Sequence, residues 1–162
     1  MAVVLARTDN RLVHGQVLEA WVPALRVAVI LVVDRELGGD PLQRMVIEGL
    51  CCRGLRVQIV TPGEAAALLE GELRETRVML LFRGLRQAIE ALDDGVSFGV
   101  LNLGNIHPRQ DSRSLTVSVY LTAEDDLLLG ELAGRGVALE ARAVPADRSP
   151  DVGRWLEERA AC

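Results

Sequence analysis

Five short apolar runs, separated by segments of helical length, constrain the fold of this chain more than any other feature of its sequence. The runs are rich in β-branched and aliphatic residues, and polar residues or glycine bound each of them, at 2–6, 27–33, 57–60, 77–82 and 98–103. Runs of this length and composition predict buried strands. Their alternation with helices predicts a mostly parallel sheet covered on both faces, which is a three-layer α/β/α fold.

Local signals mark where the intervening helices begin. Asp40 and Thr61 are each followed by proline, which places an N-cap before a Pro at the first helical position. A third helix is expected over 84–93, and Thr122 begins a sequence that resembles a capping box. We expect a last short helix over 149–159, opened by a Ser-Pro pair.

Two further segments are strand candidates. Segment 115–121 alternates imperfectly, whereas 137–144 alternates well between apolar and polar residues. Clean alternation predicts a strand with one exposed face, so we expect 137–144 near an edge of the sheet. Because no linker, repeat or low-complexity segment interrupts the pattern, the chain is expected to form one domain, 1–162.

Composition excludes several classes of protein. Hydrophobic residues make up 49% of the chain and charged residues 25%, which is typical of a globular protein and not of a disordered one. No apolar run approaches the roughly 20 residues that span a bilayer, and the first residues lack the basic stretch of a secretory signal, so we expect neither membrane insertion nor secretion. A net charge of −5 without a basic stripe disfavours nucleic acid as a partner.

The cysteines and the basic residues narrow the chemistry. Cys51, Cys52 and Cys162 are odd in number and two are adjacent, which argues against a disulfide framework and predicts a reduced, cytoplasmic protein. No CxxC spacing supports a structural zinc site. All 18 basic residues are Arg, which excludes Schiff-base chemistry and a P-loop lysine. A bound phosphate would therefore be held by Arg, backbone N–H groups or polar side chains.

Both histidines follow predicted strands. In open α/β sheets, sites form beyond the carboxyl ends of the strands. The segment after the first strand contains Arg7, Arg11 and His14, and the segment after the fifth contains His107 and Arg109. These two segments should lie at one edge of the sheet, and we expect the functional site there.

The segment 7–17, RTDNRLVHGQV, has the parts of a phosphoryl acceptor. His14 lies just before or within the first turn of the next helix, where free backbone N–H groups and the helix dipole favour an anion. Arg11 offers a bidentate fork to phosphate, and Asp9 can restrain an arginine or the imidazole. Gly15 lets the backbone approach closely. Because a neutral histidine is nucleophilic near neutral pH, the segment combines a nucleophile with support for incoming negative charge.

Other interpretations of this segment stay open. Asp9 could be an N-cap, Arg11 a surface ion pair and His14 a polar residue at a helix start with no further role. A metal site would join His14, His107 and Asp9, although the adjacent arginines would repel a cation. A hydrolase triad or a nucleotide site has no local support, because GxSxG, GxGxxG and GxxxxGK[ST] are absent.

The same segment resembles the signature of the mannose/sorbose family of phosphotransferase-system enzyme IIB subunits, which is approximately RIDDRLIHGQV. The match holds Arg, Asp, Arg, His, Gly and Gln in register, and a tryptophan follows at Trp21. Similarity continues in the family's order over nearly the whole chain, through the stretches VVDRELGGDP, VMLLFRG, GVLNLGNI, LTAEDD and GVALEARAVP. The resemblance implies the three-layer fold that the strand pattern also predicts.

The resemblance further implies a phosphocarrier for sugar uptake. In that family the histidine of the HGQ motif accepts a phosphoryl group from a phosphohistidine of the IIA protein or domain. It passes the group to a sugar that enters through the membrane components IIC and IID. Carried over, His14 is the phosphorylated residue, through Nδ1, and Arg11 stabilises the phosphate, with no metal or cofactor implied. The remaining motif residues are expected to support the site: Arg7, Asp9, Gly15 and Gln16.

Some residues depart from the family pattern. Thr8 and Asn10 replace the Ile and Asp of the signature, and Gly104 is followed by Asn105 where the family usually has a second glycine. His107 has no role that the family transfers, and an exposed loop position is its simpler interpretation. Four residues outside the motif are candidates for lining the site: Arg83, Asn102, Gly104 and His107.

We expect a cytoplasmic protein that associates peripherally with the membrane through IIC and IID. His14 should lie near the surface, because two partners have to reach it. Two other functions stay open: a regulatory module whose phosphohistidine modulates a partner without sugar transport, and an α/β scaffold with an inert loop. Selection of the sugar is expected in the membrane components, and the sequence predicts neither the sugar nor an oligomeric state.

Overall fold

A single parallel sheet organises the chain in the computed structural model, which describes residues 2–49 and 54–161. Six strands follow the order β3-β2-β4-β1-β5-β8, and each neighbouring pair is parallel. The predicted parallel α/β fold is confirmed. The strands are β1 (Val3–Asp9), β2 (Val29–Val33), β3 (Arg56–Val60), β4 (Val78–Phe82), β5 (Val100–Asn105) and β8 (Ala138–Ala141).

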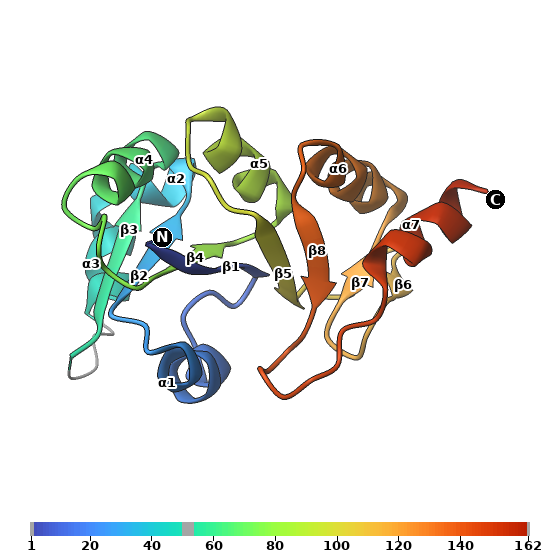
Figure 1. Cartoon of the computed structure of the whole chain (residues 1–162), viewed down its shortest axis with the longest axis horizontal. Helices are drawn as coiled ribbons and strands as arrows, with labels where there is room; N and C mark the ends of the chain where they lie inside the picture. Colours follow the sequence, from blue (N-terminus) through green and yellow to red (C-terminus); the bar gives the residue numbers. More distant parts are fainter. Residues whose placement is uncertain (1, 50–53, 162) are drawn as a thin grey trace.

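Helices cover both faces of this sheet, which confirms the three layers (Figure 1). One face carries α4 (Pro62–Glu70), α5 (Leu85–Asp93) and α6 (Ala123–Gly134). The other carries the π-helical turn η1 (Val17–Trp21), which continues directly into α1 (Val22–Leu25). The remaining helices are α2 (Arg35–Gly38), α3 (Pro41–Glu48) and α7 (Val152–Ala160).

Each face of the sheet has its own hydrophobic core. Leu80 packs with the side chains beneath α4, α5 and α6. Its neighbour Leu81 packs instead with Val17 and Trp21 on the face of η1. Successive side chains of a strand point to opposite faces, so a strand buried on both faces is continuously apolar. This is why the central strands could be recognised from their composition.

The predicted helix starts are present, with one displacement. The side chain of Asp40 accepts hydrogen bonds from the first turn of α3, and Thr61 and Thr122 both form complete capping boxes. The last helix was predicted to begin at residue 149 but begins later, with Asp151 as its N-cap. The hydroxyl of Ser149 is engaged elsewhere, where it accepts from the backbone N–H of Ala141 at 2.8 Å.

The strand candidate 115–121 is not a strand of the main sheet. Only β7 (Tyr120–Leu121) is extended there, and it pairs antiparallel with β6 (Arg113–Ser114) outside the main sheet. The alternation of apolar and polar residues over 115–121 reflects the β6–β7 hairpin and not a sheet strand. Val119 is buried in the hairpin, whereas Val117 at its tip is 92% exposed. Strand β8 lies at the edge of the sheet as predicted, but it is shorter than 137–144.

Strand β1 extends beyond the apolar run 2–6 from which it was predicted. Its pairing with β4 continues through Arg7 and Thr8, and its pairing with β5 reaches Asp9. These polar residues were predicted to lie in the loop after the strand. Arg7 and Asp9 stay in the sheet because their buried side chains find partners on β5 and at the start of the first helix. The central strand therefore carries buried charge into the site.

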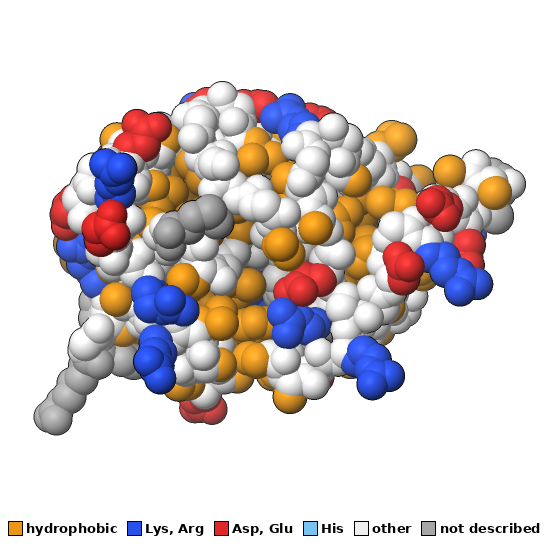
Figure 2. Space-filling model, in the orientation of Figure 1, with side chains coloured by type: hydrophobic (Ala, Val, Ile, Leu, Met, Phe, Trp, Pro, Cys, Tyr) orange, Lys and Arg blue, Asp and Glu red, His pale blue; other side chains and the backbone are white. Residues whose placement is uncertain are grey.

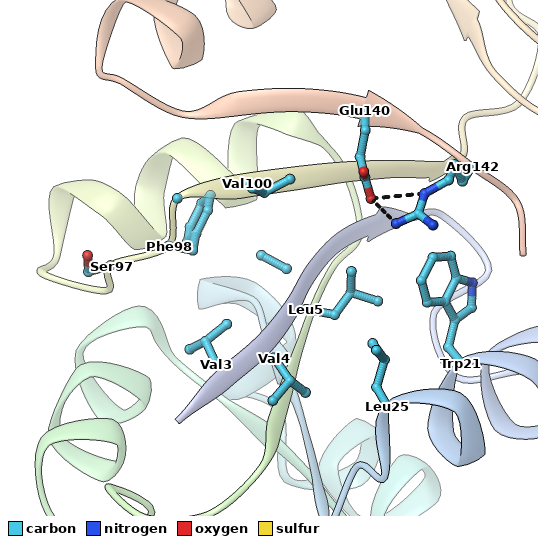
Figure 3. A pocket seen from close by; sticks show the side chains of 12 residues that line it. Val3, Val4, Leu5, Trp21, Leu25, Ser97, Phe98, Val100, Glu140 and Arg142 are labelled. Carbon is cyan, nitrogen blue, oxygen red and sulfur yellow. Dashed lines mark hydrogen bonds and ion pairs between the residues drawn. The ribbon is translucent and has the colours of Figure 1, made fainter. Parts of the chain in front are cut away.

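A cleft of about 350 Å³ opens beside η1 and α1. Leu5 of β1, Leu25 of α1 and Val100 of β5 line its apolar part, and Trp21 and Arg142 border it (Figure 3). Figure 2 shows hydrophobic side chains gathered in the hollow of this face, between charged ones.

Two sequence predictions concern membranes and cysteines. Among the residues that the structure describes, no helix is both long and apolar enough to cross a bilayer. Cys51, Cys52 and Cys162, for which a reduced state was predicted, lie outside the described residues.

Candidate functional site

His14 stands at the junction between a tight turn and the first helix. Helical backbone begins at Gly15, and the carbonyl of His14 accepts from the N–H of Leu18 at 3.0 Å. Before it, Leu12 adopts a left-handed conformation with φ of 56°, and its N–H donates to the carbonyl of Asp9 at 2.9 Å. A left-handed non-glycine residue is unusual, and here it turns the chain back so that His14 returns to the end of β1.

The imidazole of His14 is held by Asp9. Its Nε2 lies 2.8 Å from Oδ2 of Asp9, whose side chain is fully buried, while the side chain of His14 is 10% exposed. A carboxylate can only accept, so Nε2 carries the hydrogen and the neutral ring has its lone pair on Nδ1. Nδ1 is buried and has no hydrogen-bond partner within the described part of the chain. The nitrogen with the free lone pair is therefore the one without a competing contact.

Arg7 is the buried counter-charge of Asp9. Its Nη2 lies 3.1 Å from Oδ2 of Asp9, and the guanidinium is completely buried. It also donates to the side chains of Asn102 at 2.7 Å and Gln16 at 3.1 Å, and to the carbonyl of Arg142 at 2.9 Å. Burial lowers the pKa of Arg7 from its ordinary value, while the charge and hydrogen bond of Asp9 act in the opposite direction. Such a pair is stable only when its remaining hydrogen-bonding groups are satisfied, as they are here.

The packing around Arg7 explains two neighbouring residues. A Cβ at Gly104 would overlap the guanidinium of Arg7, so only glycine leaves room for it. The centre of the Trp21 ring lies 5.3 Å from Cζ of Arg7 and 5.2 Å from Cζ of Arg142. Both distances fit cation–π contacts, which stabilise a desolvated cation. Trp21 is therefore part of the arginine's environment and not only of the core.

Residues of β8 extend the same network to the edge strand. Glu140 accepts from Asn102 at 3.2 Å. It also accepts from Nη2 of Arg142 at 2.8 Å, as Figure 3 shows. Glu140 and Arg142 could not be selected from the sequence, because an alternating edge strand predicts exposed polar side chains. Their relation to Arg7 depends on β8 pairing with β5, which the local sequence does not show.

Asn105 is a further residue that sequence reasoning did not place in the site. Its Nδ2 donates to Oδ2 of Asp9 at 2.9 Å and to Oε1 of Gln16 at 3.1 Å. In the sequence, Asn105 differed from the family pattern only by standing where the family usually has a second glycine. Its position at the carboxyl end of β5, next to β1 in the sheet, was the available signal.

Arg11 and Gly15 flank the histidine without filling the space around it. The backbone N–H of Arg11 donates to Oδ1 of Asp9 at 3.0 Å, while its side chain is exposed and has no hydrogen bond or ion pair to residues 2–49 or 54–161. A Cβ at Gly15 would meet nothing within 4 Å. Among the described residues, Arg11 therefore has an uncommitted guanidinium three residues before His14, and the backbone directly after His14 is open.

Arg83 and His107 lie elsewhere at the carboxyl edge. Arg83 pairs with Asp34 and Glu36, each at 3.1 Å. His107 is exposed and lines a hollow of about 300 Å³ together with Arg83 and Asn10, and His14 is not among the residues lining that hollow. The structure thus brings Asn102 and Gly104 to Arg7, the partner of Asp9, and leaves Arg83 and His107 outside this network.

The metal site considered from sequence does not form. No group of three His, Cys, Asp or Glu side chains suited to a metal ion occurs within the described ranges. Asp9 does meet His14, but the same carboxylate oxygen is shared with the cationic Arg7.

Known proteins resemble this chain over nearly its whole length. The profile of the family described as "PTS system sorbose subfamily IIB component" matches residues 3–161. The sorbose-specific EIIB component of Lacticaseibacillus casei is 29% identical over 159 residues, covering 98% of this chain and 97% of that protein. The fructose-specific EIIB component of Bacillus subtilis strain 168 is 29% identical, covering 93% of each. The crystal structure of the IIBSor domain of the sorbose permease from Klebsiella pneumoniae superposes with a TM-score of 0.87 at 28% identity, covering all of both chains.

Proposed function

Because the chain belongs to the sorbose subfamily of phosphotransferase-system IIB components, which are sugar phosphotransferases, we propose that it is a phosphocarrier whose acceptor is His14. It takes the phosphoryl group from a phosphorylated IIA protein or domain. It then passes the group to a sugar that enters through the membrane components IIC and IID. The observation that carries this proposal is the 2.8 Å contact between Nε2 of His14 and the buried carboxylate of Asp9.

The contact with Asp9 supports Nδ1 as the nucleophile. In the first transfer, the lone pair on Nδ1 attacks phosphorus as the phosphorus–nitrogen bond of the donor breaks, and the donor nitrogen keeps the electron pair. Nε2 keeps its hydrogen toward Asp9, so the positive charge of the phosphorylated ring meets a fixed carboxylate. In the second transfer, a sugar hydroxyl attacks phosphorus, its proton passes to solvent, and Nδ1 regains its lone pair.

The backbone beside His14 suits the incoming anion. The first N–H groups of a helix have no intrahelical partner, and Gly15 begins the helix with open space above it. A phosphoryl group on Nδ1, the nitrogen nearer the backbone, lies within reach of these donors and of the helix dipole. Arg11 adds a free guanidinium that can form a bidentate contact with phosphate oxygens.

Access to Nδ1 requires a small movement. The His14 side chain reaches the surface, but its Nδ1 is covered. We infer that donor docking shifts the turn that contains Leu12, whose left-handed backbone is the strained element of the site. Closure by the docked partner then keeps water from the phosphorus during transfer.

Localisation and organisation follow from the proposed role. We infer a cytoplasmic protein that associates with the membrane through IIC and IID. We also infer that residues 1–162 act as one IIB domain, which is supported by a sheet whose strands range from Val3 to Ala141.

Incubation with phosphorylated IIA, followed by intact mass measurement, tests the first transfer. The proposal predicts a gain of one phosphoryl group by the wild-type protein and none by His14→Ala. Membranes that contain IIC and IID, supplied with sugar, should then discharge the phosphoprotein. A protein that is charged but never discharged would support a regulatory module in place of sugar transport.

A further inference from the structure

Four side chains form a closed ring of hydrogen bonds around the carboxylate that holds His14. Nη2 of Arg7 donates both to Oδ2 of Asp9 and to Oε1 of Gln16, at 3.1 Å each. Nδ2 of Asn105 donates to the same two oxygens, at 2.9 and 3.1 Å. Two acceptors are thus each bridged by the same two donors, so every member has two partners in the ring.

The chemistry of the ring fixes the orientation of its amides. Asp9 can only accept, and Gln16 must present its oxygen because Arg7 can only donate. Asn105 therefore has to present its NH₂ group to both oxygens. Of the four members, Asn105 comes from the adjacent strand β5, whereas Arg7 and Asp9 belong to β1 and Gln16 to the first helical turn.

In the sequence, His14 lies between two members of the ring. Asp9 precedes it by five residues and Gln16 follows it by two, and Asn105 donates a hydrogen bond to each of them. Without Asn105, Arg7 would be the one remaining bridge between Asp9 and Gln16 in this ring. The Asp9 carboxylate would keep its contacts with Arg7 and with the N–H of Arg11, but it would lose the donor that fixes Oδ2 from β5, so its orientation toward Nε2–H of His14 would be less constrained.

We infer that Asn105 is a positioning residue for phosphoryl transfer: it locks the Asp9 carboxylate against the helix start, so that His14 keeps its Nε2–H tautomer and directs Nδ1 to phosphorus. This role rests on the proposed function of His14. It acts through Asp9 and Gln16, since Asn105 makes no hydrogen bond to the imidazole among the described residues. Loss of a residue that orients a metal-ligating histidine typically costs roughly 10- to 100-fold in affinity or activity, and we expect a loss at the lower end of that range here.

Nitrogen-15 NMR of the unphosphorylated protein reads the tautomer of His14 directly. The wild-type protein should show one form with hydrogen on Nε2, and Asn105→Ala should show a mixture of tautomers. Its rate of phosphoryl transfer from phosphorylated IIA should fall by roughly ten-fold, with the half-saturating donor concentration unchanged. A folded Asn105→Ala protein with the wild-type tautomer and rate would overturn the inference.

Two matched variants separate positioning from general stability. Ser118→Ala removes a 2.9 Å hydrogen bond to the carbonyl of Gly104 outside the ring, and it should lower the melting temperature without changing the tautomer or the rate. If Asn105→Ala does not fold, Asn105→Ser keeps one donor and should give an intermediate rate and tautomer mixture. A Ser118→Ala protein that loses the tautomer as completely as the Asn105 variants would show that the effect is only structural.

A double-variant cycle tests the ring itself. If Asn105 and Gln16 act through one ring, Gln16→Ala together with Asn105→Ala should lose little more rate than either change alone, because opening the ring once removes the constraint. Independent losses that multiply would overturn the inference. A wild-type protein that accepts no phosphate would refute the proposed function, while the tautomer comparison would still decide the role of Asn105.

Discussion

Oδ2 of Asp9 lies 2.8 Å from Nε2 of His14 and 3.1 Å from Nη2 of Arg7, so one buried oxygen serves both the candidate nucleophile and a buried cation. The arginine is the counter-charge of the carboxylate, and the carboxylate fixes the tautomer of the histidine because it can only accept a hydrogen bond. Stability and chemistry are therefore joined at a single atom, and substitutions near it should affect both.

Asp9→Asn should destabilise the fold and impair phosphate acceptance together. The change leaves the fully buried Arg7 without its counter-charge, and breaking a buried ion pair in this way costs roughly 3–5 kcal/mol. Chemical denaturation measures the loss. Glu72→Gln is the matched control, because its pair with Arg56 is exposed and should cost less than about 1 kcal/mol. Equal losses in the two variants would mean that burial does not govern the Arg7 pair.

Gly104→Ala should be costly although it adds one methyl group. The added Cβ would overlap the guanidinium of Arg7, and overpacking of this kind typically costs about 1–3 kcal/mol. Gly99→Ala is the control, because a Cβ there meets nothing within 4 Å. Thermal unfolding of the two variants compares them. A Gly104→Ala protein as stable as Gly99→Ala would show that the guanidinium can shift without loss.

Arg11→Ala should reduce transfer far more than stability. Its side chain is exposed and without a partner in the described residues, so the free energy of unfolding should change by less than about 1 kcal/mol. The rate of acceptance from phosphorylated IIA should fall several-fold or more, because a donor to the phosphoryl oxygens is lost. Arg11→Lys should restore part of the rate, since an ammonium lacks the planar fork. Rapid-quench labelling measures these rates, and wild-type transfer by the alanine variant would refute the role.

Gly15→Ala separates folding from access of the phosphoryl group. Nothing in the structure opposes a Cβ at this position, so stability should change by less than about 1 kcal/mol. If the phosphoryl group approaches the backbone here, the methyl group should slow its acceptance. Transfer at the wild-type rate in a normally folded variant would place the phosphate away from Gly15.

The sequence predicted the parts of the fold that depend on local signals. The apolar central strands and the N-caps at Asp40, Thr61 and Thr122 can be recognised from residues that are adjacent in the sequence. The hairpin that replaces the predicted strand 115–121 was missed, because burial of alternate residues looks the same in a short hairpin and in a sheet strand.

The candidate site was only partly predictable for a physical reason. His14, Arg11 and Asp9 could be selected from their spacing, but the inclusion of Arg7 and Asp9 in β1 could not. Polar residues after an apolar run normally indicate a loop, and these two stay in the strand only because distant residues satisfy them. Asn102 and Asn105 come from the neighbouring strand, nearly a hundred residues away in sequence.

The position of the phosphate on the protein tests the central claim most directly. The wild-type protein, charged by phosphorylated IIA, should show by nitrogen-15 NMR one phosphohistidine substituted at Nδ1, with Nε2 still protonated toward Asp9. His107→Ala should give the same spectrum, and His14→Ala should fold and give none. A phosphate on Nε2 of His14, or one that persists in His14→Ala and disappears in His107→Ala, would contradict the account.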